Sequence, residues 1–315
     1  MTQKLVAIVG PTATGKTALA IALARTLGGE IVGADSRQVY RHMDIGTAKP
    51  TPEERSLARD HLIDVVDPDQ EFSLAQYLEL AVAALEDVWS RGKQPLLVGG
   101  SGQYVWALLE GWRVPRLPPQ RKLRRELEER AARQGAGALH GELVQVDPKA
   151  AARIDPRNVR RVIRALEVHK ATGCPISYWQ EKGPPPWQTF ILGLTCPRQV
   201  LYERIDARVD AMMEAGLVDE VRALLAMGYS PSLAALSGIG YKQVCQYLAG
   251  ELDLATAVAQ IKTATHRLAR QQYTWFRLDD RRIRWIDVSL DAPFGEAARL
   301  VESEAGLWRR VAHGR

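Results

Sequence analysis

The feature that most constrains this 315-residue chain is a complete phosphate-binding loop near its beginning. Residues 10–17 read Gly-Pro-Thr-Ala-Thr-Gly-Lys-Thr and fit the pattern G-x-x-x-x-G-K-[ST]. A β-branched apolar run precedes the loop, and a helix-forming segment follows it. In such a strand–loop–helix unit, backbone N–H groups and the helix N-terminus converge on phosphate oxygens. We therefore predict a phosphate site made of Gly10, Pro11, Thr12, Ala13, Thr14, Gly15, Lys16 and Thr17.

Two side chains of this loop have distinct expected roles. Lys16 adds a mobile positive charge next to the phosphate, and Thr17 is placed to hold Mg²⁺ through its hydroxyl. The loop alone does not identify the phosphate compound that it binds.

Strand and helix patterns alternate along the first hundred residues. Residues 30–34 and 94–98 read as short buried strands, and residues 73–91 place apolar side chains on one stripe of a helix. This rhythm predicts an α/β fold, a P-loop parallel-sheet core with helices on both faces. Because ligands bind at the carboxyl ends of parallel strands, we expect the phosphate loop, Asp35 and residues 99–102 to share one cleft.

The pattern changes from about residue 117 to a charged, mostly helical segment. Gly135–His140 resembles a loop within it, and residues 183–186 form a stiff Gly-Pro-Pro-Pro linker at its end. Strand character then returns, and long helices follow at about 198–213, 217–227 and 254–276. We predict a P-loop core with C-terminal helices over residues 1–116 and 187–315, and a mostly helical insertion domain over residues 117–186.

Positive charge is concentrated in this insertion. Residues 113–164 carry fourteen Arg or Lys against six Asp or Glu, a net charge of +8 in a chain whose total is +5. Basic side chains bind polyanions favourably because they displace counterions from phosphates. The segment therefore suggests a docking surface for a polyanion, with a solvated helical face as the alternative.

Cysteine usage and hydropathy indicate the compartment. Cys174, Cys196 and Cys245 share no metal-ligand spacing and fit free thiols in a reducing compartment. No apolar run approaches the roughly 20 residues of a membrane span, and the residues before the first strand lead us to expect no signal peptide. We expect a cytoplasmic monomer with no membrane partner.

The expected cleft lacks one common feature of phosphate-loop enzymes. Many of them place an Asp at the end of an apolar strand, where it holds Mg²⁺ and supports nucleotide hydrolysis. Here residues 96–98 end in Gly99-Gly100-Ser101, and the nearby carboxylate is Asp35. A carboxylate so close to a phosphate site is electrostatically unfavourable, which suggests that Asp35 has a separate role. One such role is to accept a proton from an incoming nucleophile. The alternative is that Asp35 is a partner of Mg²⁺ or of Thr17.

Eight segments follow one another in an order that resembles the bacterial tRNA dimethylallyltransferases, or IPP transferases. The match spans almost the whole chain, and Asp44–Pro50, Asp-Ile-Gly-Thr-Ala-Lys-Pro, is more specific than the phosphate loop. The segments are Gly10–Thr17, Asp35–Tyr40, Met43–Pro50, His61–Asp64, Leu97–Tyr104, Arg160–Glu167, Gly238–Lys242 and Arg270–Phe276.

The resemblance implies a reaction and assigns three catalytic residues. A dimethylallyl group would pass from dimethylallyl diphosphate to N6 of the adenine on the 3′ side of the tRNA anticodon, and the loop would hold this diphosphate in place of ATP. Asp35 matches the general base, and Ser101 stands where the family usually has Thr. Arg208 matches an arginine that contacts pyrophosphate, with Arg204 as a rival on the same helical face.

The resemblance also implies contacts with the tRNA anticodon stem-loop, whose bases leave the stack easily. Arginines among these contacts are expected to bind phosphates more often than bases. One departure from the family is Asp60-His61, where two histidines are more usual. The implied tRNA contacts are Asp35, Ser36, Arg37, Gln38, Ser101, Arg124, Arg160, Arg161 and Arg164.

Three other functions stay open at this point. A prenyltransferase acting on free AMP would share the loop and Asp35, but it needs no long helical insertion. A small-molecule kinase would use the loop for ATP, but the expected strand-end Asp is missing. A non-enzymatic RNA-binding protein would leave the phosphate loop unexplained.

Overall fold

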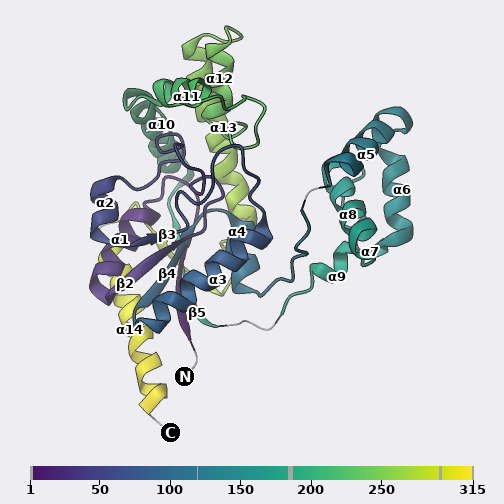
Figure 1. Cartoon of the computed structure of the whole chain (residues 1–315). Helices are drawn as coiled ribbons and strands as arrows, with labels where there is room; N and C mark the ends of the chain where they lie inside the picture. The colour runs from purple at the N-terminus through teal and green to yellow at the C-terminus, as the bar shows by residue number, and fades with distance from the viewer. Residues whose placement is uncertain (1–2, 119, 184–186, 291–292, 314–315) are drawn as a thin grey trace. The chain divides into compact units, whose positions relative to one another are not determined.

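The computed structural model of the chain describes residues 3–118, 120–183, 187–290 and 293–313. The chain divides into two compact units (Figure 1). The core unit comprises residues 1–73, 77–109 and 187–315, and the helical unit comprises residues 74–76 and 110–186. The insertion expected at residues 117–186 lies within the helical unit, and the proline linker, beyond Gly183, lies outside the described residues.

The core unit is built on a six-stranded parallel sheet, which confirms the predicted fold class. The strand order is β3-β2-β4-β1-β5-β6. In this register Val9 at the end of β1 lies between Gly99 of β4 and Gly193 of β5. The strands are β1 (Lys4–Val9), β2 (Gly29–Gly33), β3 (Asp60–His61), β4 (Gln94–Gly99), β5 (Gln188–Thr195) and β6 (Ile283–Asp287).

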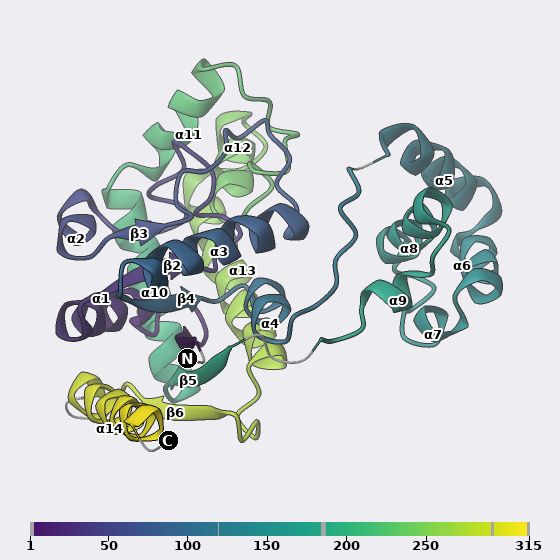
Figure 2. The ribbon, with the colours of Figure 1, turned by 60° about the horizontal axis from the view of Figure 1, so that its bottom comes forward.

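Helices surround this sheet, and one group of them stands over the carboxyl ends of the strands (Figure 1). That group is α10 (Arg198–Glu214), α11 (Leu217–Ala226), α12 (Tyr241–Leu248) and α13 (Leu254–Trp275). Figure 2 shows α14 (Pro293–His313) alongside β6. The others are α1 (Lys16–Leu27), α2 (Pro52–Leu57), α3 (Leu74–Ser90) and α4 (Gly102–Leu109). None of the described helices is long and apolar enough to cross a membrane.

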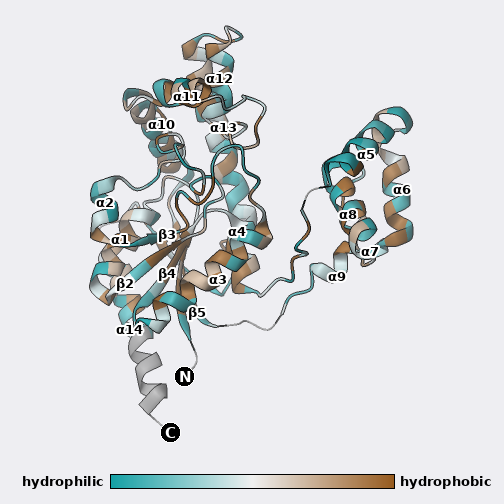
Figure 3. Ribbon diagram, viewed as in Figure 1, coloured by the Kyte–Doolittle hydropathy of each residue, from teal (hydrophilic) through white to brown (hydrophobic). Residues whose placement is uncertain are grey.

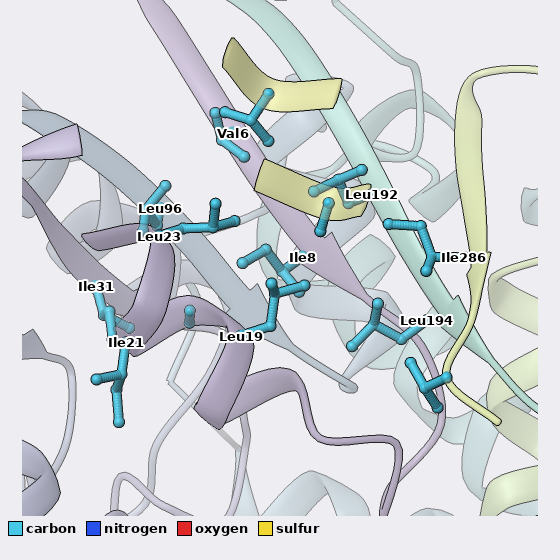
Figure 4. Close-up of a cluster of buried hydrophobic side chains, with 14 of the residues drawn as sticks. Val6, Ile8, Leu19, Ile21, Leu23, Ile31, Leu96, Leu192, Leu194 and Ile286 are labelled. Carbon is cyan, nitrogen blue, oxygen red and sulfur yellow. The ribbon is translucent and has the colours of Figure 1, made fainter. Parts of the chain in front are cut away.

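The main hydrophobic core lies between the sheet and α1 (Figure 4). Val6 and Ile8 of β1 pack there against Leu19 and Leu23 of α1, and all four are at most 2% exposed. Burying a side chain of this size stabilises the fold by about 1.5–3 kcal/mol. This packing holds the first strand and first helix in place, and with them the loop that joins them.

The helical unit has a hydrophobic core of its own, which includes Leu127, Leu139, Leu143 and Leu166. Figure 3 shows hydrophobic residues along α6 and α8, whereas α5 is largely hydrophilic. The expectation of a loop at Gly135–His140 is wrong beyond its first residue, because α6 begins at Ala136. The helices are α5 (Arg121–Gln134), α6 (Ala136–Val146), α7 (Pro148–Ala151), α8 (Val159–Thr172) and α9 (Ile176–Trp179).

Candidate active site

A pocket of about 480 Å³ opens in the core unit at the carboxyl ends of β1, β2 and β4. The structure brings together here Thr12 of the phosphate loop, Asp35, Ser101 and Arg208. Further walls come from residues 46–48, residues 102–104, residues 237–241 and the face of α13 that carries Ile261, Thr265, Leu268, Gln271, Gln272 and Trp275. Segments that are far apart in the sequence thus form one cleft.

The backbone of the phosphate loop adopts a conformation that requires glycine at Gly10 and positive φ at two further positions. Gly10 has φ of +137°, and a Cβ there would lie 2.4 Å from the carbonyl oxygen of Leu194. Ala13 and Gly15 also have positive φ, at 64° and 83°. The hydroxyl of Thr14 donates to the carbonyl oxygen of Pro11 at 2.9 Å and closes the loop. These backbone angles and the hydrogen bond within the loop therefore hold the phosphate loop in its conformation.

Lys16 begins α1 and directs its ammonium group into the loop. Its Nζ donates to the carbonyl oxygen of Pro11 at 2.5 Å. Burial, with the charge of Arg208 adding to it, lowers the pKa of Lys16 to about 7, and Asp35 acts in the opposite direction. A bound phosphate would favour the protonated lysine, because an opposite charge stabilises the ammonium form.

The structure separates the two candidate arginines of α10. Nη1 of Arg208 lies 3.4 Å from the hydroxyl of Thr12, and the residue lines the pocket. Burial lowers the pKa of Arg208, against the opposing charge of Asp35. Nη2 of Arg204 instead donates to the carbonyl oxygen of Val288 at 2.9 Å. The geometry therefore favours Arg208 over Arg204 as the partner of a phosphate.

Hydrogen bonds tie the segment of Asp35 to that of Ser101. The hydroxyl oxygen of Ser101 accepts from the N–H of Ser36 at 3.0 Å, and the N–H of Ser101 donates to the carbonyl oxygen of Ala34 at 3.2 Å. The N–H of Arg37 donates to Oδ1 of Asp35 at 2.8 Å, which fixes the carboxylate after β2. A carboxylate and a hydroxyl are thus held at the same edge of the sheet.

Arg37 and Gln38 use their side chains to hold the pocket walls. Nη1 of Arg37 donates to the carbonyl oxygen of Ala234 at 2.9 Å. Nε2 of Gln38 donates to the carbonyl oxygens of Thr47 and Ala48 at 3.2 and 3.0 Å. Both residues connect the turn after β2 to loops that line the cleft.

The four arginines predicted in the helical unit fall into two pairs. Arg124 and Arg164 bind the carboxylate of Glu167, which is fully buried, at 2.8 and 2.6 Å. Arg160 and Arg161 are exposed on α8, and within the described residues neither side chain has a hydrogen bond or ion pair. The first pair stabilises the helical unit, and the second is accessible to an anionic partner.

Sequence reasoning missed Glu220, which holds the loop of the Asp44–Pro50 segment. The carboxylate of Glu220 accepts the N–H groups of Asp44, Ile45 and Gly46 at 2.8, 2.7 and 3.1 Å. It also accepts the hydroxyl of Tyr241 at 2.6 Å. Glu220 lies 174 positions from Gly46, so no spacing in the sequence indicates the pair.

Two further contacts show why this loop depends on its residue types. A Cβ on Gly46 would lie 2.5 Å from the ring of Tyr241, so only glycine allows this close approach. Nζ of Lys49, a buried residue, lies 2.6 Å from the carbonyl oxygen of Tyr40 and 2.6 Å from the carboxylates of Asp44 and Asp64. The segment that is most specific in sequence is therefore an anchored pocket wall.

The donor set available to a metal ion is limited. No group of three or more His, Cys, Asp or Glu side chains that could hold a metal occurs among the described residues. Thr17 is half-buried beside Lys16 and offers one hydroxyl. Such a set fits Mg²⁺ held mainly by phosphate oxygens and water, because this ion commonly takes few protein ligands.

Comparison with known proteins gives one consistent result. The family model for IPP transferase matches residues 38–279. The tRNA dimethylallyltransferase of Roseiflexus castenholzii is 56% identical, over 92% of this chain and 94% of its own length. That of Chloroflexus aurantiacus is 57% identical, over 87% of this chain and 93% of its own.

Two solved structures are similar as well. The tRNA isopentenylpyrophosphate transferase of Bacillus halodurans has a TM-score of 0.74 and 41% identity, with 99% of each chain covered. A eukaryotic dimethylallyltransferase acting on tRNA has a TM-score of 0.77 and 28% identity, with 91% of this chain and 74% of that chain covered.

The anchoring role of Glu220 leads to a prediction for Glu220→Gln. Replacing a carboxylate that accepts four hydrogen bonds leaves backbone donors without partners, so we expect the free energy of unfolding to fall by about 1–3 kcal/mol. Hydrogen exchange at the amides of Asp44, Ile45 and Gly46 should also become faster. Asp219→Asn is the control, because Asp219 is exposed on the same helix and forms its ion pair with Arg222, away from the loop of residues 44–46. Equal amide exchange in both variants would contradict the anchoring role.

The lowered pKa of Lys16 predicts how pyrophosphate binding depends on pH. Lys16 loses its proton in the free protein as the pH rises through about 7, so binding then requires proton uptake. We expect the affinity ratio of wild type to Lys16→Met to fall roughly tenfold between about pH 6.5 and about pH 8, by proton linkage. Taking this ratio cancels the titration of pyrophosphate itself. Calorimetric titration at each pH measures it, and a constant ratio would refute the assignment.

Proposed function

This chain belongs to the IPP transferase family, and we propose that it is a tRNA dimethylallyltransferase. In this reaction the dimethylallyl group passes from dimethylallyl diphosphate to N6 of the adenine on the 3′ side of the anticodon, and pyrophosphate leaves. The observation that carries the proposal is the shared pocket of the phosphate loop, Asp35 and Ser101. It combines a site for a diphosphate with a base and a hydroxyl, as transfer to a weak nucleophile requires.

The phosphate loop supports the donor half of the proposal. Backbone N–H groups of residues 13–17, the ammonium of Lys16 and the guanidinium of Arg208 would stabilise the negative charge that develops on the leaving pyrophosphate. Thr17 is the residue that would hold Mg²⁺ beside the diphosphate, where the ion supplies further neutralisation of that charge.

Asp35 and Ser101 support the acceptor half. Adenine N6 is a weak nucleophile because its lone pair is delocalised into the ring. As the bond from N6 to C1 of the dimethylallyl group forms and the bond from C1 to oxygen breaks, Asp35 takes the proton from N6 and pyrophosphate takes the electron pair. The hydroxyl of Ser101 would hydrogen-bond the acceptor and fix its orientation. General base catalysis of this kind contributes on the order of 10²–10⁴-fold.

The helical unit supports recognition of the tRNA anticodon stem-loop. The exposed Arg160 and Arg161 would bind phosphates, while Arg124 and Arg164 would reach the RNA with the N–H groups that Glu167 leaves available. Ser36, Arg37 and Gln38 would contact the acceptor at the edge of the pocket. The proposal includes a monomer that acts on tRNA in the cytoplasm, with residues 117–186 as the tRNA-binding part.

The direct test is a transfer assay with tRNA, Mg²⁺ and radiolabelled dimethylallyl diphosphate. We expect the label in tRNA, and none in a tRNA whose adenine beside the anticodon is replaced by guanine. Equal labelling of both tRNAs would remove the assigned acceptor. A protein that labels free AMP in preference to tRNA would instead be an adenylate prenyltransferase.

Asp35→Asn tests the general base. Asparagine keeps the shape of the side chain but cannot take the proton, so we expect transfer to slow by at least about a hundredfold while tRNA binding stays nearly unchanged. Asp60→Asn is the control, because Asp60 is also half-buried and begins β3, the strand next to β2, but lies outside the pocket lining. Single-turnover rates and filter binding give the two quantities. Near-normal transfer by Asp35→Asn would exclude Asp35 as the base.

A further inference from the structure

Gln272 is a buried polar residue of α13 that connects two loops of the pocket. Its side chain ends in an amide group, and the residue is 8% exposed. Oε1 accepts the N–H of Thr12 at 2.8 Å, and Nε2 donates to the carbonyl oxygen of Gly100 at 3.0 Å. One side chain thus joins the phosphate loop to the residue that precedes Ser101.

The close approach of Gln272 is built into the neighbouring backbone. A Cβ on Gly100 would lie 2.3 Å from Nε2 of Gln272 and 3.4 Å from the carbonyl oxygen of Gly10. Gly100 therefore leaves the space that the amide occupies. The strands β1 and β4 are paired up to Val9 and Gly99, and Gln272 bridges the loops that begin just beyond this pair.

Glutamine has the donor and the acceptor that the two loops require. The N–H of Thr12 needs an acceptor, and the carbonyl of Gly100 needs a donor. A side-chain amide supplies both groups. Glutamate would lack the donor, and methionine would lack both groups. A buried donor or acceptor left without a partner destabilises the fold, so the pair of bonds favours one spacing of the loops.

The bond to Thr12 has two effects on the phosphate loop. It occupies the N–H of Thr12, so an incoming diphosphate would use the other amides of the loop. It also orients Thr12, whose hydroxyl lies 3.4 Å from Nη1 of Arg208. Gln272 thereby connects Arg208, the phosphate loop and the segment of Ser101 in one chain of contacts.

We propose that Gln272 is a positioning residue, which sets the distance between the donor held by the phosphate loop and the acceptor held at Asp35 and Ser101. The inference rests on the proposed prenyl transfer. Gln272 need not touch either reacting atom, because its action is to fix two loops that do. A displacement of about 1 Å between reacting groups can cost on the order of a hundredfold in rate.

The test uses Gln272→Met in the full chain, which keeps the length of the side chain and removes both hydrogen bonds. We expect kcat for transfer to tRNA to fall at least about tenfold, since alignment is lost. The Kd for inorganic pyrophosphate and the KM for tRNA should change less than about threefold, because each loop keeps its own contacts. A residue that only stabilised the fold would not produce this split between kcat and binding.

Tyr273→Phe is the matched control on the same helix. The hydroxyl of Tyr273 lies 2.8 Å from that of Thr195, and Tyr273 does not line the pocket. Loss of the Tyr273 hydroxyl removes a partly buried hydrogen bond at the residue that follows Gln272. We therefore expect a lower melting temperature and a kcat within about threefold of wild type. All rates are measured below the melting temperature of each variant.

Gly100→Ala supplies a second and independent perturbation, because its methyl group would displace the amide of Gln272. We expect Gly100→Ala to lower kcat as Gln272→Met does, and the double variant to be no slower than the slower single one. Additive losses would overturn the inference. So would a Gln272→Met enzyme with normal kcat, or one whose loss follows weaker pyrophosphate binding. A wild-type protein that labels no tRNA would overturn the proposed function and the inference with it.

Discussion

Parallel pairing of the central strands is the constraint on which the rest of the structure depends. Since Val9 of β1 lies between Gly99 and Gly193, the loops after the central strands leave the sheet at one edge. Both faces of β1 are buried, and a slip of one residue would exchange the side chains that it presents to them, so the packing of Val6 and Ile8 against α1 fixes this register. The phosphate loop and the segment of Ser101 are therefore neighbours because of hydrophobic packing beneath them.

Much of the fold was predictable because its signals are local. The helix expected at residues 73–91 is α3, Leu74–Ser90, and the helix expected at 254–276 is α13, Leu254–Trp275. Apolar periodicity and the glycine pattern of the phosphate loop are readable within a short window. The start of α6 was missed because Gly135 and Gly137 favour a loop by propensity, while burial of Leu139 and Leu143 outweighs that preference.

The contacts that shape the candidate site were less predictable, because they join distant positions by single hydrogen bonds. Glu220 has four donors from two other segments, and Gln272 has partners 260 and 172 positions away. Periodicity carries no information about such pairs. Motif resemblance marked the surrounding segments, but it did not distinguish a residue that contacts the substrates from one that holds a loop.

Because Lys16 titrates near neutral pH, binding of the diphosphate donor affects the proton balance of the proposed reaction. A lysine whose pKa is lowered to about 7 is only partly charged in the free pocket at neutral pH. Under the proposed reaction, arrival of the donor would draw a proton from solvent onto Lys16, and departure of pyrophosphate would return it. Asp35 would release a different proton, the one taken from adenine. Each turnover would then exchange protons with water through two separate groups, one coupled to occupancy of the phosphate loop and one to bond formation.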